Sequence, residues 1–135
     1  MKKNEKARLM CIAYLSTEGS LHETQRQEDR QLNYLKDYAK ANNVDICLLV
    51  RRKGMGQAIV NKQWETMADL IAKGKADGIL IANTEAVSPS IKDVFGKIGQ
   101  IYEAGGVVVS VDEGRLTLPI KRMINGRMVL INERI

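Results

Sequence analysis

Leu9-Met10-Cys11-Ile12-Ala13-Tyr14-Leu15 is the stretch that decides how this chain folds, and Ser16-Thr17 follows it directly. An apolar run of this length, with no alternating polar residues, is typical of a β-strand that is covered on both faces. Ser16 then stands at the carboxyl end of the first strand, where open α/β sheets hold their ligands. The stretch therefore predicts an α/β fold and marks Ser16 as a candidate functional residue.

Further apolar runs alternate with helical patterns along the chain. We expect a mainly parallel, four-stranded sheet with helices on both faces, with strands at residues 9–15, 46–50, 78–82 and 107–111. The first helix is expected to begin near Ser20, which has the capping-box spacing to Glu23. The second helix is expected to follow a loop at residues 51–61 and to end at Gly74.

The remaining elements are a third helix and a C-terminal hairpin. Ser88 has the character of an N-cap, and Pro89 suits the first helical position after it. Residues 118–124 and 127–131 flank Asn125-Gly126, a strong signal for a two-residue β-hairpin because both turn residues tolerate positive φ. The apolar flanks of this hairpin favour packing against a second copy, so we expect a homodimer.

The length and composition limit what the chain can be. Its 135 residues indicate one domain at 1–135, with a core at 8–113 and the hairpin at 118–131. The net charge of +5 suits a polyanionic partner, whereas the 4% aromatic content argues against recognition by base stacking. Cys11 and Cys47 lie in apolar runs typical of buried free thiols. With no apolar run of membrane-spanning length, we expect a cytoplasmic protein without cofactor or metal.

Few charged or polar motifs stand out beyond Ser16. Arg51-Arg52-Lys53 is a basic cluster that either contacts a DNA backbone or is simply solvated. His22, the single histidine, lies in the first turn of the first helix and is expected to be solvated. Gly54-Met55-Gly56 lacks the spacing and the Lys-Ser/Thr ending of a phosphate-binding loop, so it does not predict nucleotide binding.

The order of these motifs resembles the catalytic domain of serine recombinases, the resolvases and invertases. The family's first strand reads Tyr-x-Arg-x-Ser-Thr and delivers the nucleophilic serine, and a Gln-containing helix ending in Tyr-Ala follows. This chain has Ile12-Ala13-Tyr14-Leu15-Ser16-Thr17, then Gln27 and Gln31, and then Tyr38-Ala39. Met55-Gly56 stands for the family's Ser-Gly pair, and Glu85 takes the position of its aspartate. The resemblance spans roughly residues 8–113 and implies a resolvase-like fold.

The chain departs from the family where its chemistry is concentrated. Four family arginines surround the scissile phosphate, and this chain replaces them with Tyr14, Asn61, Ala86 and Pro89. Guanidinium groups stabilise the charge that develops on the phosphate oxygens during attack. The resemblance therefore implies a domain with impaired catalysis that has a regulatory or assembly role in a mobile-element setting. The modest net charge of +5 predicts in addition that any DNA binding is weak and independent of sequence.

Two alternatives stay open. An active serine recombinase would use Ser16 to form a 5′-phosphoseryl link to DNA in spite of the missing arginines. A flavodoxin-like module would instead bind a small anion or nucleotide at the turn of residues 16–19, where a helix begins. The family's long helix after the sheet and its DNA-binding region have no counterpart in the C-terminal stretch, where Pro119 and the hairpin lie.

Overall fold

The computed structural model describes residues 8–17, 21–116, 120–124 and 127–131. Five strands form one sheet in the order β2-β1-β3-β4-β5. The first four strands are parallel, and the fifth runs antiparallel to its neighbour. Their bounds are β1 (Leu9–Leu15), β2 (Val44–Arg51), β3 (Gly78–Ile81), β4 (Val107–Ser110) and β5 (Gly114–Leu116). The sheet confirms the expected α/β fold with one strand more than expected.

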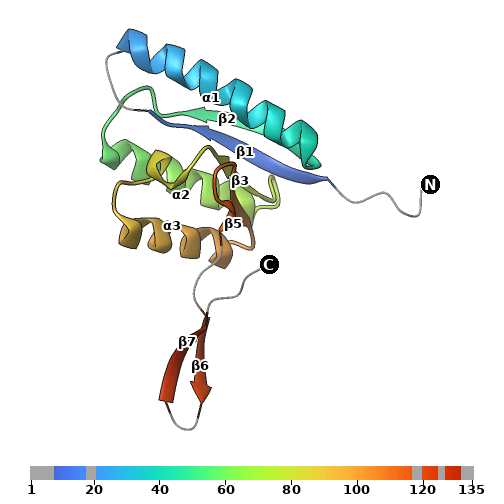
Figure 1. Cartoon of the computed structure of the whole chain (residues 1–135), viewed down its shortest axis with the longest axis vertical. Coiled ribbons are helices and arrows are strands. Elements are labelled where there is room, and N and C mark those ends of the chain that lie inside the picture. The colour runs from blue at the N-terminus through green and yellow to red at the C-terminus, as the bar shows by residue number, and fades with distance from the viewer. Residues whose placement is uncertain (1–7, 18–20, 117–119, 125–126, 132–135) are drawn as a thin grey trace, which may run out of the picture.

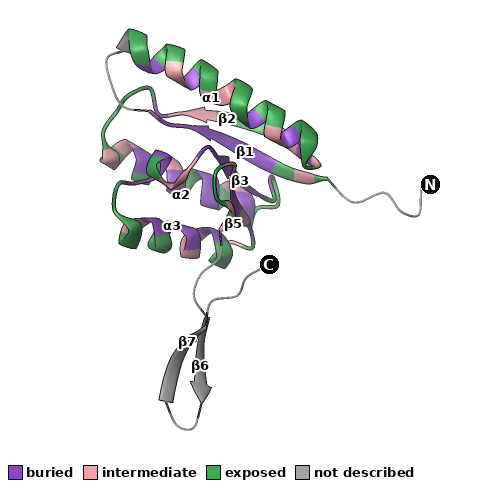
Figure 2. Ribbon diagram, viewed as in Figure 1, coloured by how far each residue is buried: buried purple, intermediate pink, exposed green. Residues whose placement is uncertain are grey.

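The sheet lies between two layers of helices, as Figure 1 shows. α1 (Leu21–Ala41) covers one face, and α2 (Gln57–Ala72) and α3 (Ile91–Glu103) cover the other. Alternate residues of β1 enter the two cores, because successive side chains of a strand point to opposite faces. Figure 2 shows β1 buried along most of its length, as a strand with two covered faces requires.

Three boundaries differ from the expectation. α2 begins at Gln57, so the predicted loop at residues 51–61 is too long; Lys53 and Gly54 have φ of 57° and 72°, which turns the chain quickly. α3 begins at Ile91 with Ser90 as its N-cap, two residues after the predicted Ser88. The Ser88 hydroxyl accepts from the Ser90 N–H instead and closes the preceding turn.

β5 escaped prediction because it is short and has no apolar alternation. Gly114 has a φ of 86°, which allows the chain to reverse directly after β4.

The predicted end of the second helix is confirmed. Gly74 has a φ of 77°, and its N–H donates to the Ile71 carbonyl in a helix C-cap.

The two cysteines have different environments. Cys11 is fully buried, as predicted, but Cys47 is exposed. The difference arises because β2 is an edge strand of the sheet. Cys47 also stands at an irregularity, since the pairing of β1 with β2 shifts between Cys11 and Ile12. The prediction that both thiols are buried is therefore wrong for Cys47.

The C-terminal segment forms a separate two-stranded sheet. β6 (Ile120–Ile124) and β7 (Arg127–Ile131) pair antiparallel, with Ile124 opposite Arg127, which confirms the hairpin. The Asn125-Gly126 turn, Pro119 and the Ser20 helix cap lie outside the described residues. Within the described helices, none is long and apolar enough to cross a membrane.

Candidate functional site

Ser16 is held at the end of β1 by a side chain from α1. The Ser16 N–H donates to Oε1 of Gln31 at 2.9 Å, and Nε2 of Gln31 donates to the Ser16 carbonyl at 2.9 Å. Ser16 itself is only 3% exposed. Two bonds to one planar amide fix the backbone of Ser16 relative to α1.

An arginine lies beside the Ser16 hydroxyl. β2 runs parallel to β1, so both strands end at the same edge of the sheet. Arg52 follows β2, and its N–H continues the ladder by donating to the Leu15 carbonyl at 2.9 Å. Its Nη1 donates to Oγ of Ser16 at 3.3 Å, and its Nε donates to the Met55 carbonyl. The guanidinium is nearly buried, at 7% exposed for the residue.

These groups line a pocket of about 450 Å³, which we call the Ser16 pocket. The pocket is formed by α1 and by the segments that directly follow β1, β2 and β3. Its lining residues are Ser16, Thr17, Gln31, Arg52, Asn83, Glu85, Ala86 and Pro89. Glu85 lies on a short 3₁₀ helix (Thr84–Ala86), whose N-cap Asn83 accepts from the Ala86 N–H at 3.2 Å. Among the described residues, the lining of the pocket thus includes one guanidinium and one carboxylate.

The four positions that replace the family's arginines occupy different places. Ala86 and Pro89 line the Ser16 pocket and bring no charge to it. Tyr14 is fully buried, its hydroxyl donates to Oε1 of Gln63 at 2.6 Å, and burial raises the pKa of that hydroxyl above its ordinary value. Asn61 is exposed on α2, where it accepts from Gln57. None of the four positions supplies a cation to Ser16.

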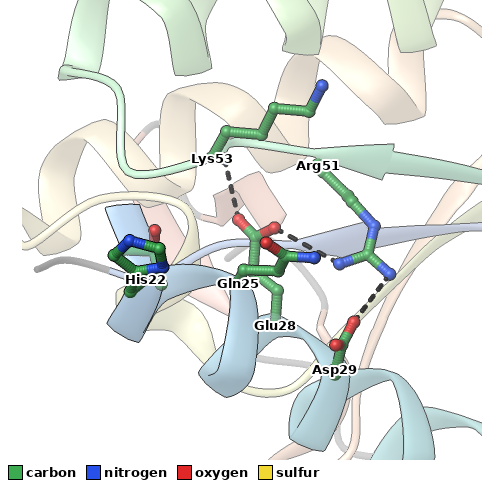
Figure 3. Close-up of a pocket in the computed structure, with 7 residues that line it drawn as sticks. His22, Gln25, Glu28, Asp29, Arg51 and Lys53 are labelled. Carbon is green, nitrogen blue, oxygen red and sulfur yellow. Dashed lines mark hydrogen bonds and ion pairs between the residues drawn. The ribbon is translucent and has the colours of Figure 1, made fainter. Parts of the chain in front are cut away.

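The basic cluster Arg51-Arg52-Lys53 does not form one surface. Arg51 pairs with Oδ1 of Asp29 at 3.0 Å and with the buried Glu28 at 3.5 Å. Lys53 is exposed, and its backbone N–H donates to Oε2 of Glu28 at 2.8 Å. Figure 3 shows Glu28 between Arg51 and the Lys53 backbone, with the Lys53 side chain extending away. Arg52 alone turns toward Ser16 and is buried, so the three side chains do not share one solvated face. Contact of Arg51, Arg52 and Lys53 with DNA stays a prediction.

Glu28 anchors the chain on both sides of Arg52. The carboxylate contacts Arg51 and the backbone of Lys53 and is itself almost completely buried. These contacts hold the chain around Arg52 against α1. Glu28 and Gln31 are three residues apart on α1, which places them on one side of the helix. One helix therefore positions both Ser16 and Arg52.

A second pocket adjoins the Glu28 side of this arrangement. It measures about 620 Å³, and Figure 3 shows the residues that line it: His22, Thr24, Gln25, Glu28, Asp29, Arg51 and Lys53. His22 therefore does not line the Ser16 pocket. Within the described ranges, no three His, Cys, Asp or Glu side chains gather closely enough to bind a metal ion. The turn at residues 16–19 extends beyond the described part, so anion binding there stays a prediction.

Comparisons with known proteins were made on sequence and on structure. No family model matches the sequence, and no curated protein matches it. Several solved structures are similar, and three of them illustrate the likeness. A resolvase family site-specific recombinase from Streptococcus pneumoniae has a TM-score of 0.66 and 17% identity, over 79% of this chain and 74% of that one.

The other two structures carry related descriptions. The N-terminal catalytic domain of TP901-1 integrase has a TM-score of 0.61 and 18% identity, over 78% of each chain. The C-terminal catalytic domain of ISC1926 TnpA, an IS607-like serine recombinase, has a TM-score of 0.60 and 16% identity, over 76% of this chain and 70% of that one. The α/β body of this chain therefore has the resolvase-type fold of serine recombinase catalytic domains.

Proposed function

We propose that this chain is a resolvase-like domain that associates with DNA or with recombination proteins and does not cleave DNA. The observation that carries the proposal is the content of the Ser16 pocket. Arg52 is the one cation among the described residues that line the pocket, and Glu85 opposes it in charge. A site built for phosphoryl transfer concentrates positive charge around the phosphate, and this pocket does not.

The rate that is expected to be lost with the missing arginines argues against DNA cleavage. Removing one preorganised donor from an oxyanion site typically lowers the rate by about 10²–10³. The four guanidinium groups of the family's pattern are absent. Arg52, which directly follows β2, is the guanidinium that lies beside Ser16. Arg52 also donates to Oγ of Ser16, which occupies a lone pair that attack on phosphorus would use. We expect Ser16 to serve in binding or in structure.

The decisive experiment looks for a covalent intermediate. Supercoiled and nicked DNA are incubated with the full chain, quenched with detergent, and resolved on denaturing gels with and without protease. We expect no protein-linked DNA from the wild type. A linked product that disappears in Ser16→Ala would overturn the proposal.

The second candidate is an active recombinase with a rebuilt site, and Arg52 favours it. In this candidate the Arg52 guanidinium would stabilise the transferring phosphate while Ser16 forms a 5′-phosphoseryl link. The same gels separate the candidates if Arg52→Gln is included. A covalent product lost in both Ser16→Ala and Arg52→Gln would establish the rebuilt site.

DNA binding without cleavage is tested by its dependence on salt. A chain with net charge +5 is expected to bind duplex DNA weakly and without sequence preference. The logarithm of the affinity should fall linearly with the logarithm of salt concentration, by about 0.9 per phosphate neutralised. Tight binding to one sequence that persists in high salt would show that this part of the proposal is wrong.

A further inference from the structure

Two adjoining hollows form one groove along α1. The first is the Ser16 pocket, and the second has a volume of about 430 Å³. Thr17, Gln31 and Asn83 line both hollows, so the two are continuous. The second hollow adds a set of α1 side chains at helical spacing, Gln27, Arg30 and Tyr34. We call the whole the α1 groove; it runs from the buried Arg52 to the exposed Tyr34.

Tyr34 places an oriented aromatic ring in this groove. The residue is 45% exposed, although the chain as a whole is poor in aromatic side chains. Its hydroxyl donates to Oδ1 of Asp112, and Oδ2 of Asp112 accepts from Nδ2 of Asn83 at 3.3 Å. The ring is thus held at its hydroxyl end before any ligand arrives, which reduces the entropy that binding must overcome.

Positive charge lies at both ends of the α1 groove. Arg52 is at one end, and Arg30 lines the other end close to Tyr34. Within the described part of the chain, Arg30 forms no ion pair. Gln31, which lines both hollows, and Tyr34 are three residues apart on α1, a rise of ~4.5 Å along the helix. One hollow therefore offers a guanidinium, and the adjoining hollow offers an aromatic ring and a second guanidinium.

We propose that the α1 groove binds a nucleotide unit, with its phosphate at Arg52 and its base stacked on Tyr34. Guanidinium groups recognise phosphate oxygens, and an exposed ring stacks on any base without regard to sequence. Arg30 would then meet the next phosphate of a strand. The inference rests on the proposed function in taking nucleic acid as the partner, and it names where the strand lies.

The chemistry of the groove also selects among nucleic acids. A base within a duplex is already stacked on its neighbours, so Tyr34 favours an unpaired strand. Glu85 lines the Arg52 end and repels negative charge there. A singly charged phosphodiester should therefore be held better than the dianionic monoester of a free nucleotide.

The test is fluorescence anisotropy of a short labelled oligothymidylate with the full chain at low salt. Tyr34→Ala is expected to weaken binding about tenfold, the loss typical of one stacked base. Tyr34→Phe keeps the ring but loses the hydrogen bond to Asp112, so its affinity should lie between those of Tyr34→Ala and the wild type. Tyr102→Ala is the matched control, because Tyr102 is an exposed tyrosine on α3, at the opposite face of the sheet.

Arg30→Ala examines the charge at the exposed end. It should weaken binding and reduce the slope of the salt dependence by about 0.7, the value for one phosphate of a single strand. Because Arg30 is exposed, its loss should leave thermal unfolding unchanged. Equal affinity of Tyr34→Ala and Tyr102→Ala, or equal binding of duplex and single strand by the wild type, would overturn the inference.

Competition by thymidine 5′-monophosphate identifies the source of the nucleotide. Weak competition indicates a nucleic-acid strand, and competition as strong as that of the unlabelled oligonucleotide indicates a free nucleotide; both support a nucleotide site. The gel experiment for cleavage does not depend on base stacking. A DNA product linked to Ser16 would therefore refute the proposed function and leave the inferred nucleotide site unaffected. Unchanged oligonucleotide affinity in Tyr34→Ala would refute the nucleotide site alone.

Discussion

The side-chain amide of Gln31 accepts a hydrogen bond from the Ser16 N–H and donates one to the Ser16 carbonyl, each 2.9 Å long. The pair ties the end of β1 to the middle of α1. Because Ser16 is almost completely buried, no water is available to replace either bond. Gln31 is therefore the residue that fixes the position of the candidate nucleophile.

Replacing Gln31 with alanine should destabilise the fold. The change leaves a buried N–H and a buried carbonyl of Ser16 without partners, at a cost of about 1–3 kcal/mol in the free energy of unfolding. Urea denaturation measures this directly. Gln25→Ala is the control, because Gln25 is exposed on the same helix. Equal midpoints for Gln31→Ala and Gln25→Ala would show that the clamp does not hold Ser16.

Glu28 and Asp29 both pair with Arg51, yet their removal should have unequal effects. Glu28→Ala deprives the Lys53 N–H of its acceptor and leaves Arg51 with one partner, so we expect a loss of about 1–3 kcal/mol in unfolding free energy. The Asp29 side chain is 57% exposed, and such a pair typically contributes less than ~1 kcal/mol. Chemical denaturation of the two variants compares them, and a larger effect for Asp29→Ala would contradict the assignment.

Gly78 should tolerate no side chain. A Cβ at this position would lie 2.4 Å from the Val107 carbonyl oxygen, so β3 and β4 would have to separate. We expect Gly78→Ala to destabilise the fold by ~1–3 kcal/mol, as overpacking does. Gly96 on α3 has nothing within 4 Å of its Cβ position, and Gly96→Ala should stabilise by ~0.5–1 kcal/mol. Thermal melts of the two alanine variants should move in opposite directions.

The two thiols should react in a fixed order. Desolvation by burial is the main cause that raises the pKa of Cys11 to about 12, so its reactive thiolate is scarce at any ordinary pH. Burial also raises the pKa of Cys47, but this residue is exposed. Iodoacetamide should therefore modify Cys47 first, faster as the pH rises, and Cys11 only after unfolding. Peptide mass mapping reads both sites, and equal labelling in the folded state would be the contrary result.

The raised pKa of Cys11 also makes the stability of the fold depend on pH. The unfolded thiol ionises near its ordinary pKa of 9.0, whereas the folded thiol stays protonated. The unfolded state is therefore favoured as the pH rises from about 9 toward 12, and this contribution to stability is complete below that window.

Homodimerisation through the C-terminal hairpin stays a prediction from the sequence. The flanks of the turn are rich in apolar residues, namely Met123, Ile124, Met128, Val129, Leu130 and Ile131. Truncation after Leu118 should convert a dimer to a monomer, as measured by sedimentation velocity. A full chain that is monomeric at high concentration, or a truncated chain that still dimerises, would remove the hairpin from the interface.

Much of the fold could be predicted because it follows from local patterns. β1 has the predicted bounds, since the apolar run begins at Leu9 and ends at Leu15, directly before the polar Ser16. Helix starts were less accurate: α2 begins at Gln57, directly after its N-cap Gly56, and α3 begins at Ile91, directly after its N-cap Ser90. β5 was missed because three residues next to a turn carry no periodicity.

The site was predicted in part. Ser16, Glu85, Ala86 and Pro89 do line one pocket, as the order of motifs indicates. Arg52 was not predicted to reach Ser16, because its position between Arg51 and Lys53 is typical of surface charge. The sequence signal for it is a cation directly after the second strand, since neighbouring parallel strands end at the same edge of the sheet.

The sequence by itself determined the alternation of strands and helices and the place of Ser16 at the end of a strand. Both follow from side-chain periodicity, which is a property of neighbouring residues. Only the tertiary structure decided what surrounds Ser16. Arg52 reaches its hydroxyl because β1 and β2 lie side by side, and Glu28 and Gln31 orient both from α1. Contacts between residues 15 to 36 positions apart depend on how the elements pack, which no local pattern encodes.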